Sequence, residues 1–125
     1  MTTNPVGWFE IPVTVMPRAI KYYETVFNLK LVPPSEETGP VIMAFFPFTS
    51  GLPGASGALV KASGYNPSSA GSLVYFSVQS IESTIKTVTD LGCRVLKPKT
   101  SIGPHGFIAF IEDHDGNRIG IHCKS

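Results

Sequence analysis

The chain has 125 residues, of which 42% are hydrophobic and 15% charged, and its formal net charge is +1. This composition is typical of a globular protein with one hydrophobic core, and it excludes a disordered chain. The scattered Lys and Arg residues argue against nucleic acid as a partner, and no apolar run has membrane-spanning length. The start lacks the basic and apolar regions of a secretory signal, so we expect a cytoplasmic protein. Two cysteines without a Cys-x-x-Cys pair predict neither a disulfide framework nor a structural zinc site.

The first half of the chain begins with an expected strand at residues 7–13. Alternation there places Phe9, Ile11 and Val13 on one face. A helix follows, because Pro17 is typical of a first turn and Asn28 of a helix end. Three shorter strands are then expected, at residues 29–33, 41–47 and 57–62.

The second half repeats this order after a stretch rich in Gly, Ser and Pro, residues 63–71, which we interpret as a linker. The two halves match at a spacing of about 65 residues. Ser80 can cap the second helix, and Gly92 ends it. The strands expected here are residues 72–79, 93–98, 106–112 and 117–123. The sequence therefore predicts an α+β fold of two βαβββ units in a single domain, with unit one at about 5–62 and unit two at about 72–125.

A hairpin is predicted between the last two strands, in the stretch GFIAFIEDHDGNRIGIH of residues 106–122. Asp115-Gly116 between two strand-like runs is a strong hairpin signal. We assign Asp113, His114 and Asp115 to the turn, where Asp is favoured for local hydrogen bonding. In the final strand, Gly120 and His122 face away from Ile119, Ile121 and Cys123.

A shared concave cup follows from the strand faces that carry both polar and apolar residues. Each helix needs the uniformly apolar face of a sheet, so the mixed faces stay free. If the two units join side by side, the mixed faces line one cup. The residues expected to line it are Trp8, Glu10, Ala58, Val60, Tyr75, Ser77, Gly120 and His122.

Four segments resemble the vicinal oxygen chelate superfamily, which comprises the glyoxalase, bleomycin-resistance and extradiol-dioxygenase proteins. They are FEIPV (9–13), RAIKYYETVFNLKL (18–31), GALVK (57–61) and GFIAFIEDHDGNRIGIH (106–122). The chain is most similar to the subgroup of predicted enzymes related to lactoylglutathione lyase. The resemblance implies paired βαβββ units, a small-molecule ligand in the cup and a homodimer, with the units paired within one chain or across two. It implies no single reaction, because one fold can carry many functions.

The resemblance also bears on metal binding. In metal-using relatives, His and Glu side chains from the first and last strands of each unit hold a divalent ion. The matching positions here are Trp8, Ala58, Leu73 and Gly120, and none can coordinate a metal through its side chain. We therefore expect the usual metal site of the family to be absent, with the identity of any cofactor left open.

Candidate functional residues are the polar and aromatic members of the cup. Glu10 and His122 can form a general acid/base pair, or they can merely satisfy each other by hydrogen bonding. Trp8 and Tyr75 can stack on a planar ligand or pack in the core. His105 can close over a ligand from its loop or remain an ordinary solvated residue. The ligand-binding residues that we expect are Trp8, Tyr75, Ser77, Val60 and His105.

Three functional hypotheses follow. The first is a glyoxalase- and bleomycin-resistance-like protein that binds a small molecule without the usual metal, any catalysis being proton transfer next to a carbonyl with Glu10 or His122 as base. The second is a divalent-metal lyase or isomerase with a rearranged site built from Glu10, His122 and His105. The third is a non-catalytic protein that sequesters a drug or metabolite.

Overall fold

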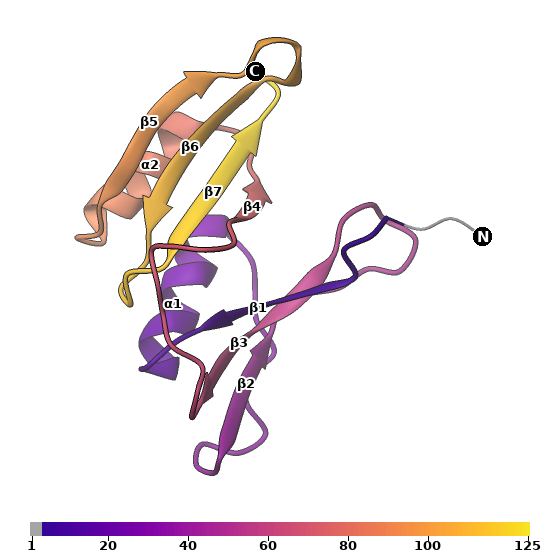
Figure 1. Ribbon diagram of the computed structural model, residues 1–125, viewed down its shortest axis with the longest axis vertical. Coiled ribbons are helices and arrows are strands. Elements are labelled where there is room, and N and C mark those ends of the chain that lie inside the picture. Colours follow the sequence, from indigo (N-terminus) through magenta and orange to yellow (C-terminus); the bar gives the residue numbers. More distant parts are fainter. Residues whose placement is uncertain (1–3) are drawn as a thin grey trace.

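The computed structural model describes residues 4–125 (Figure 1). It confirms the predicted α+β fold of two similar halves in succession. The first half contains β1 (Trp8–Pro12), α1 (Met16–Phe27), β2 (Val41–Phe45) and β3 (Ser56–Ala62). The second contains β4 (Val74–Ser77), α2 (Ile81–Asp90), β5 (Val95–Ser101), the short 3₁₀ helix η1 (Gly103–His105), β6 (Phe107–Glu112) and β7 (Arg118–Cys123). No helix in the described part of the chain is long and apolar enough to cross a membrane.

Each half forms its own sheet. The first sheet has the strand order β1-β3-β2 and the second the order β4-β7-β6-β5. In both, the opening strand pairs in parallel with the closing strand of its half, and the other pairs are antiparallel. Helix α1 contacts β2 and β3, and α2 contacts β5, β6 and β7, so one face of each sheet is covered (Figure 1). The segment between β3 and β4 crosses from one sheet to the other in front of α1 (Figure 1).

The strand expected at residues 29–33 is reduced to a single bridge, and here the prediction of a strand was wrong. Val32 exchanges two backbone hydrogen bonds with Phe45, at 2.8 and 3.0 Å, and the pairing stops there. Pro33 and Pro34 follow directly, and proline has no N–H to donate to a ladder. The first sheet therefore has three strands where the second has four.

The end of α1 and both ends of α2 carry the residues that the sequence predicts there. Asn28 takes the left-handed conformation, with φ of 52°, directly after α1. The Ser80 hydroxyl accepts a hydrogen bond from the Ser83 amide at 3.1 Å and caps α2. Gly92 follows the end of α2 with φ of 79°, a conformation that glycine adopts without a steric penalty. These signals act within a few residues, which is why sequence alone locates them.

An aromatic cluster joins the two halves. The ring of Phe76 on β4 stacks on Phe27 of α1, with centroids 4.2 Å apart. It also lies 5.7 Å from Phe9, 6.0 Å from Tyr23 and 5.5 Å from Phe46. All four partners belong to the first half, so the second half contributes one ring to an apolar site built by the first. Burial of large aromatic surface is a main source of stability in a domain of this size.

The turn between β6 and β7 is anchored to the first half by a buried carboxylate. Asp113 is only 4% exposed, and its carboxylate accepts hydrogen bonds from the Tyr23 hydroxyl at 2.6 Å and from Asn117 Nδ2 at 2.9 Å. It also accepts from the backbone amides of Asp115 and Asn117, each at 2.9 Å. Asn117 Nδ2 donates in addition to the Pro12 carbonyl of β1 at 2.8 Å. The Asp residues of this turn thus serve the structure, as the hairpin signal suggested.

This anchor makes stability depend on pH in alkaline solution. Burial, followed by the neighbouring Asp113 carboxylate, raises the pKa of Tyr23 well above its ordinary value of 10.0. A tyrosine whose pKa is higher in the folded than in the unfolded protein stabilises the fold fully below the unfolded pKa, and its contribution is lost as the pH rises further. We expect the free energy of unfolding to fall above about pH 10. Urea titrations across this range will show a shallower fall for Tyr23→Phe; an identical slope would remove Tyr23 as the cause.

Candidate functional site: the open sheet faces and the seam between them

Each sheet has one face that no helix covers, which we call its open face. Strand register places Trp8 and Glu10 on the same face as Ser56, Ala58 and Val60 of β3. The first open face includes Trp8, Glu10, Met43, Phe45, Ser56, Ala58 and Val60. The second includes Tyr75, Ser77, Ile108, Phe110, Glu112, Arg118, Gly120 and His122. The sequence-based division of residues between faces therefore places the expected side chains on the open side of each sheet.

An aromatic ring lies over one of the four positions at which the resemblance implies metal ligands. A Cβ added at Gly120 would lie 2.6 Å from the Tyr75 ring, closer than any side chain tolerates without displacing that ring. On the other sheet, Ala58 lies between Glu10 and Phe45 in the strand register, and the Phe45 ring centroid is 6.1 Å from that of Trp8. Within residues 4–125, no three His, Cys, Asp or Glu side chains are grouped so as to hold a metal ion. The donor set does not fit the divalent metal that the fold family implies.

The structure gives Glu10 and His122 different partners. Glu10 accepts a hydrogen bond from the Trp8 indole at 3.3 Å, and its carboxylate raises the pKa of the nearby Tyr65 phenol. His122 Nε2 lies 2.6 Å from the His105 carbonyl oxygen, which can only accept, so Nε2 carries a proton. Their role as an acid/base pair remains a prediction, and the geometry favours two separate groups.

The other predicted ligand-binding residues differ in accessibility. Trp8 and Tyr75 are 47% and 46% exposed, so neither is a core residue. Ser77 and His105 are exposed, and His105 belongs to η1 at the end of the second sheet. Val60 is only 1% exposed, because it lies in the central strand between Pro12 and Met43. A ligand on the first open face would therefore meet the edge residues before Val60.

A cavity of about 220 Å³ lies where the two halves meet, and we call it the seam cavity. Its walls come from β1, from the segment between β3 and β4, and from β7, and they include Glu10, Pro12, Asn66, Ser68, Ser72 and Arg118. It is bordered by both open faces, through Glu10 on one side and Arg118 on the other. Among the predicted cup residues, only Glu10 borders it.

Arg118 is a functional candidate that sequence reasoning missed. Its Nη2 donates one long hydrogen bond, 3.3 Å, to the Gly71 carbonyl, and its Nε is buried without a partner in the described structure. The guanidinium lies over the Phe110 ring, 5.6 Å from the centroid. The sequence did contain a signal for it: side chains alternate along a strand, so Arg118 on β7 shares a face with Gly120 and His122.

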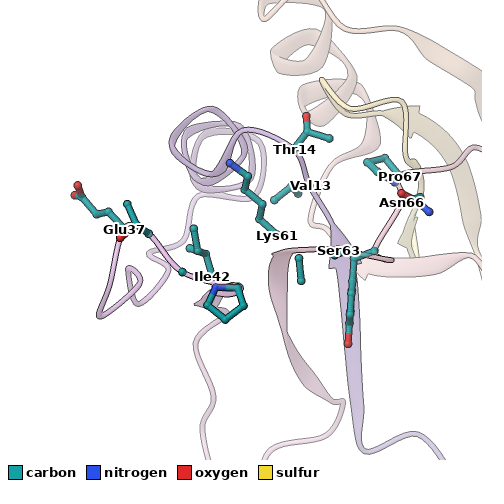
Figure 2. A pocket seen from close by; sticks show the side chains of 13 residues that line it. Val13, Thr14, Glu37, Ile42, Lys61, Ser63, Asn66 and Pro67 are labelled. Carbon is teal, nitrogen blue, oxygen red and sulfur yellow. The ribbon is translucent and has the colours of Figure 1, made fainter.

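A second cavity, of about 540 Å³, lies beside the seam cavity and shares Asn66 with it. It is enclosed by the end of β1, the end of β3 and the loop that precedes β2. Lys61 extends into the space between Glu37 and Thr14 (Figure 2). No sequence motif indicated this cavity, because it is formed by loops that come together only in the fold.

Cys93 and His114 are neighbours that the sequence did not predict. The Cys93 sulfur lies 3.4 Å from His114 Nδ1. Burial, followed by the Asp113 and Glu112 carboxylates, raises the pKa of the Cys93 thiol above its ordinary value. The thiol is therefore protonated at neutral pH, and protonated thiols are poor nucleophiles and metal ligands. This contact packs the turn against the start of β5 and does not form a reactive pair.

Comparison with known proteins identifies the family. The sequence profile of the Glyoxalase/Bleomycin resistance protein/Dioxygenase superfamily matches residues 6–121. The chain belongs to this superfamily. A glyoxylase-like domain-containing protein of Didymella fabae is 31% identical over 118 residues, covering 93% of this chain and 91% of the relative. The family assignment made from the hairpin and its companion segments is thus confirmed.

Solved structures of the superfamily share the fold at low sequence identity. A glyoxylase/bleomycin resistance protein/dioxygenase domain of Frankia sp. EAN1pec gives a TM-score of 0.74 at 16% identity, covering 99% of this chain and all of that one. The genomically encoded fosfomycin resistance protein FosX of Listeria monocytogenes gives 0.71 at 16% identity, covering 100% and 94%. Glyoxalase I of Zea mays gives 0.71 at 19% identity, covering 92% of this chain and 43% of that one. At these identities the likeness concerns the fold.

Proposed function

We propose that this superfamily member binds a small molecule on its open faces without the metal site usual in the family. The observation that supports this is the content of the four expected metal-ligand positions, Trp8, Ala58, Leu73 and Gly120, none of which carries a ligating side chain and one of which, Gly120, lies under the Tyr75 ring. Exposed aromatic faces beside a few polar groups suit a planar ligand. In place of a coordinated ion, the site offers stacking surface together with Glu10 and His122.

The reaction that these groups suit is proton transfer next to a carbonyl. Glu10 is an exposed carboxylate, and His122, with its proton on Nε2, presents Nδ1 as an acceptor when neutral. Because the two have different partners, we propose that one acts as base rather than both as a pair. We also propose a homodimer, supported by the exposed apolar side chains Val32 and Val41 at 57 and 56% exposure.

Ligand binding can be followed at Trp8, the sole tryptophan of the chain. We expect acetophenone, a planar aromatic carbonyl compound, to shift the Trp8 indole N–H signal or the Gly120 amide signal in NMR spectra. The same shifts are expected in the control variant Phe48→Ala, because Phe48 is 69% exposed and lies outside both open faces. Shifts that spare both open faces would contradict the proposal.

The same sample distinguishes catalysis from sequestration. In deuterated water, the acetophenone methyl protons exchange if a base of the site removes one of them. Glu10→Gln or His122→Gln abolishes this exchange, according to which residue is the base. Binding without exchange supports the sequestering hypothesis. Stoichiometric divalent metal in protein purified without chelator or affinity-tag metal would instead support the metal-dependent lyase or isomerase.

A further inference from the structure

We propose that the seam cavity binds a small amino acid as a zwitterion, with Arg118 taking the carboxylate and Glu10 the ammonium group. This inference goes beyond the proposed function, because it assigns a second ligand to the seam cavity between the open faces. It names the chemical class of that ligand and adds a residue, Arg118, that no sequence motif indicated.

Arg118 has no carboxylate partner in the described structure. Its register partner across β6 and β7 is Glu112, but both Glu112 oxygens are bound by Arg94, at 2.9 Å each. The other cation near the same ring is Lys97, whose Nζ lies 6.0 Å from the Phe110 centroid. The second open face therefore carries more positive than negative charge beside Phe110. A partly buried cation without a counter-ion is costly, and an incoming anion removes that cost.

The guanidinium of Arg118 is suited to a carboxylate. Arginine presents five N–H groups in a planar fork that binds a carboxylate through two parallel hydrogen bonds. Within the described part of the chain, the guanidinium has one acceptor, the Gly71 carbonyl at 3.3 Å, and this bond is long. Stacking on Phe110 restricts the orientation of the group before a ligand arrives.

Glu10 supplies the opposite charge on the facing wall. No ion pair joins Glu10 to Arg118, although both line the same cavity, so the two charges remain available to a molecule between them. The neutral polar side chains Asn66, Ser68 and Ser72 complete the wall. A simple anion would be repelled by Glu10, whereas a zwitterion satisfies both charges. The cavity, of about 220 Å³, is large enough for a small amino acid.

The experiment uses straight-chain ω-amino acids, from glycine to 6-aminohexanoate, and the corresponding unsubstituted acids as probes. Binding is measured by NMR titration of the backbone amides of residues 66–72 and of the Arg118 Nε–H. We expect one amino acid to bind at least tenfold more tightly than its unsubstituted acid. Arg118→Gln should weaken both by tenfold or more, whereas Glu10→Gln should weaken the amino acid and strengthen the unsubstituted acid. Lys86→Gln, which removes an equal charge from an exposed helix residue, should change neither.

Three results would overturn the inference. They are equal binding of an amino acid and its unsubstituted acid, unchanged binding to Arg118→Gln, and no shift at the seam cavity with any probe. The proposed function is judged separately, by the acetophenone titration at Trp8 and Gly120. If acetophenone binds and the amino acids do not, the small-molecule function stands and the zwitterion site is wrong. If the amino acids bind and acetophenone does not, the site stands and the planar ligand is wrong.

Discussion

Asp113→Ala is expected to lower the free energy of unfolding by about 3–5 kcal/mol, because it leaves several buried donors without an acceptor. The carboxylate accepts four hydrogen bonds, from the Tyr23 hydroxyl, from Asn117 Nδ2 and from two backbone amides of its own turn. Two of these fix the turn itself, and the one from Tyr23 joins the second half of the chain to α1. Urea unfolding followed by circular dichroism measures the loss.

Asp90→Ala is the matched control for this substitution. Asp90 is an exposed carboxylate paired with Lys86 one turn away on α2, at 3.0 Å, and such surface pairs contribute little. Its loss should change the free energy of unfolding by less than about 0.5 kcal/mol. Tyr23→Phe should fall between the two, since it removes one donor and leaves the turn intact. If Asp113→Ala costs no more than Asp90→Ala, the buried carboxylate does not anchor the turn.

Phe76→Ala is expected to cost about 2–4 kcal/mol, somewhat less than the loss of a fully buried aromatic, because Phe76 is a partly buried side chain packed against the core. Phe76 is the ring of the second half that enters the aromatic cluster of the first, stacked 4.2 Å from Phe27. The cavity left behind would be bordered by Phe9, Tyr23, Phe27 and Phe46, whose positions are fixed by α1 and the first sheet. The loss therefore weakens the contact between the halves as well as the core.

Thermal and urea unfolding of Phe76→Ala should be compared with Phe48→Ala. Phe48 is 69% exposed, so its truncation removes little buried surface and is expected to be within about 0.5 kcal/mol of the wild type. Phe76 and Asp113 act at different contacts between the same two halves, so unfolding of the double variant Phe76→Ala/Asp113→Ala tests whether the halves unfold together.

If Phe76→Ala alone shows a second, separate unfolding transition, the aromatic cluster, and not the turn at Asp113, couples the unfolding of the two halves.

Sequence patterns predicted secondary structure reliably where it depends on residues close together in the chain. Asn28 and Gly92 end helices because of their own backbone conformations, and Ser80 caps α2 through an amide three residues away. The strand expected at residues 29–33 failed for a reason also present in the sequence, since Pro33 and Pro34 remove the donors that a strand needs. The hairpin signal of residues 106–122 predicted both its turn and the family, because those residues carry turn chemistry and strand alternation together.

The candidate site was less accessible to such reasoning. Parity placed Trp8, Glu10, Tyr75 and His122 on open faces, because alternation along a strand is a local property. Strand alternation did not reveal which of these residues come together, since that depends on how the two sheets are oriented. The structure brings Glu10 to the seam cavity with Arg118 and brings His122 to the carbonyl of His105.

By itself the sequence determined the α+β class, the repetition of the unit, the superfamily and the absence of side-chain ligands at the usual metal positions. These properties depend on residue type, spacing and alternation. Only the tertiary structure decided that Tyr75 covers Gly120, that Asp113 binds Tyr23, and that Arg118 has no counter-ion among residues 4–125 because Arg94 occupies Glu112. Each of these is a contact between residues at least 18 positions apart, and the energy of such a contact depends on burial and on competing partners that no local pattern encodes.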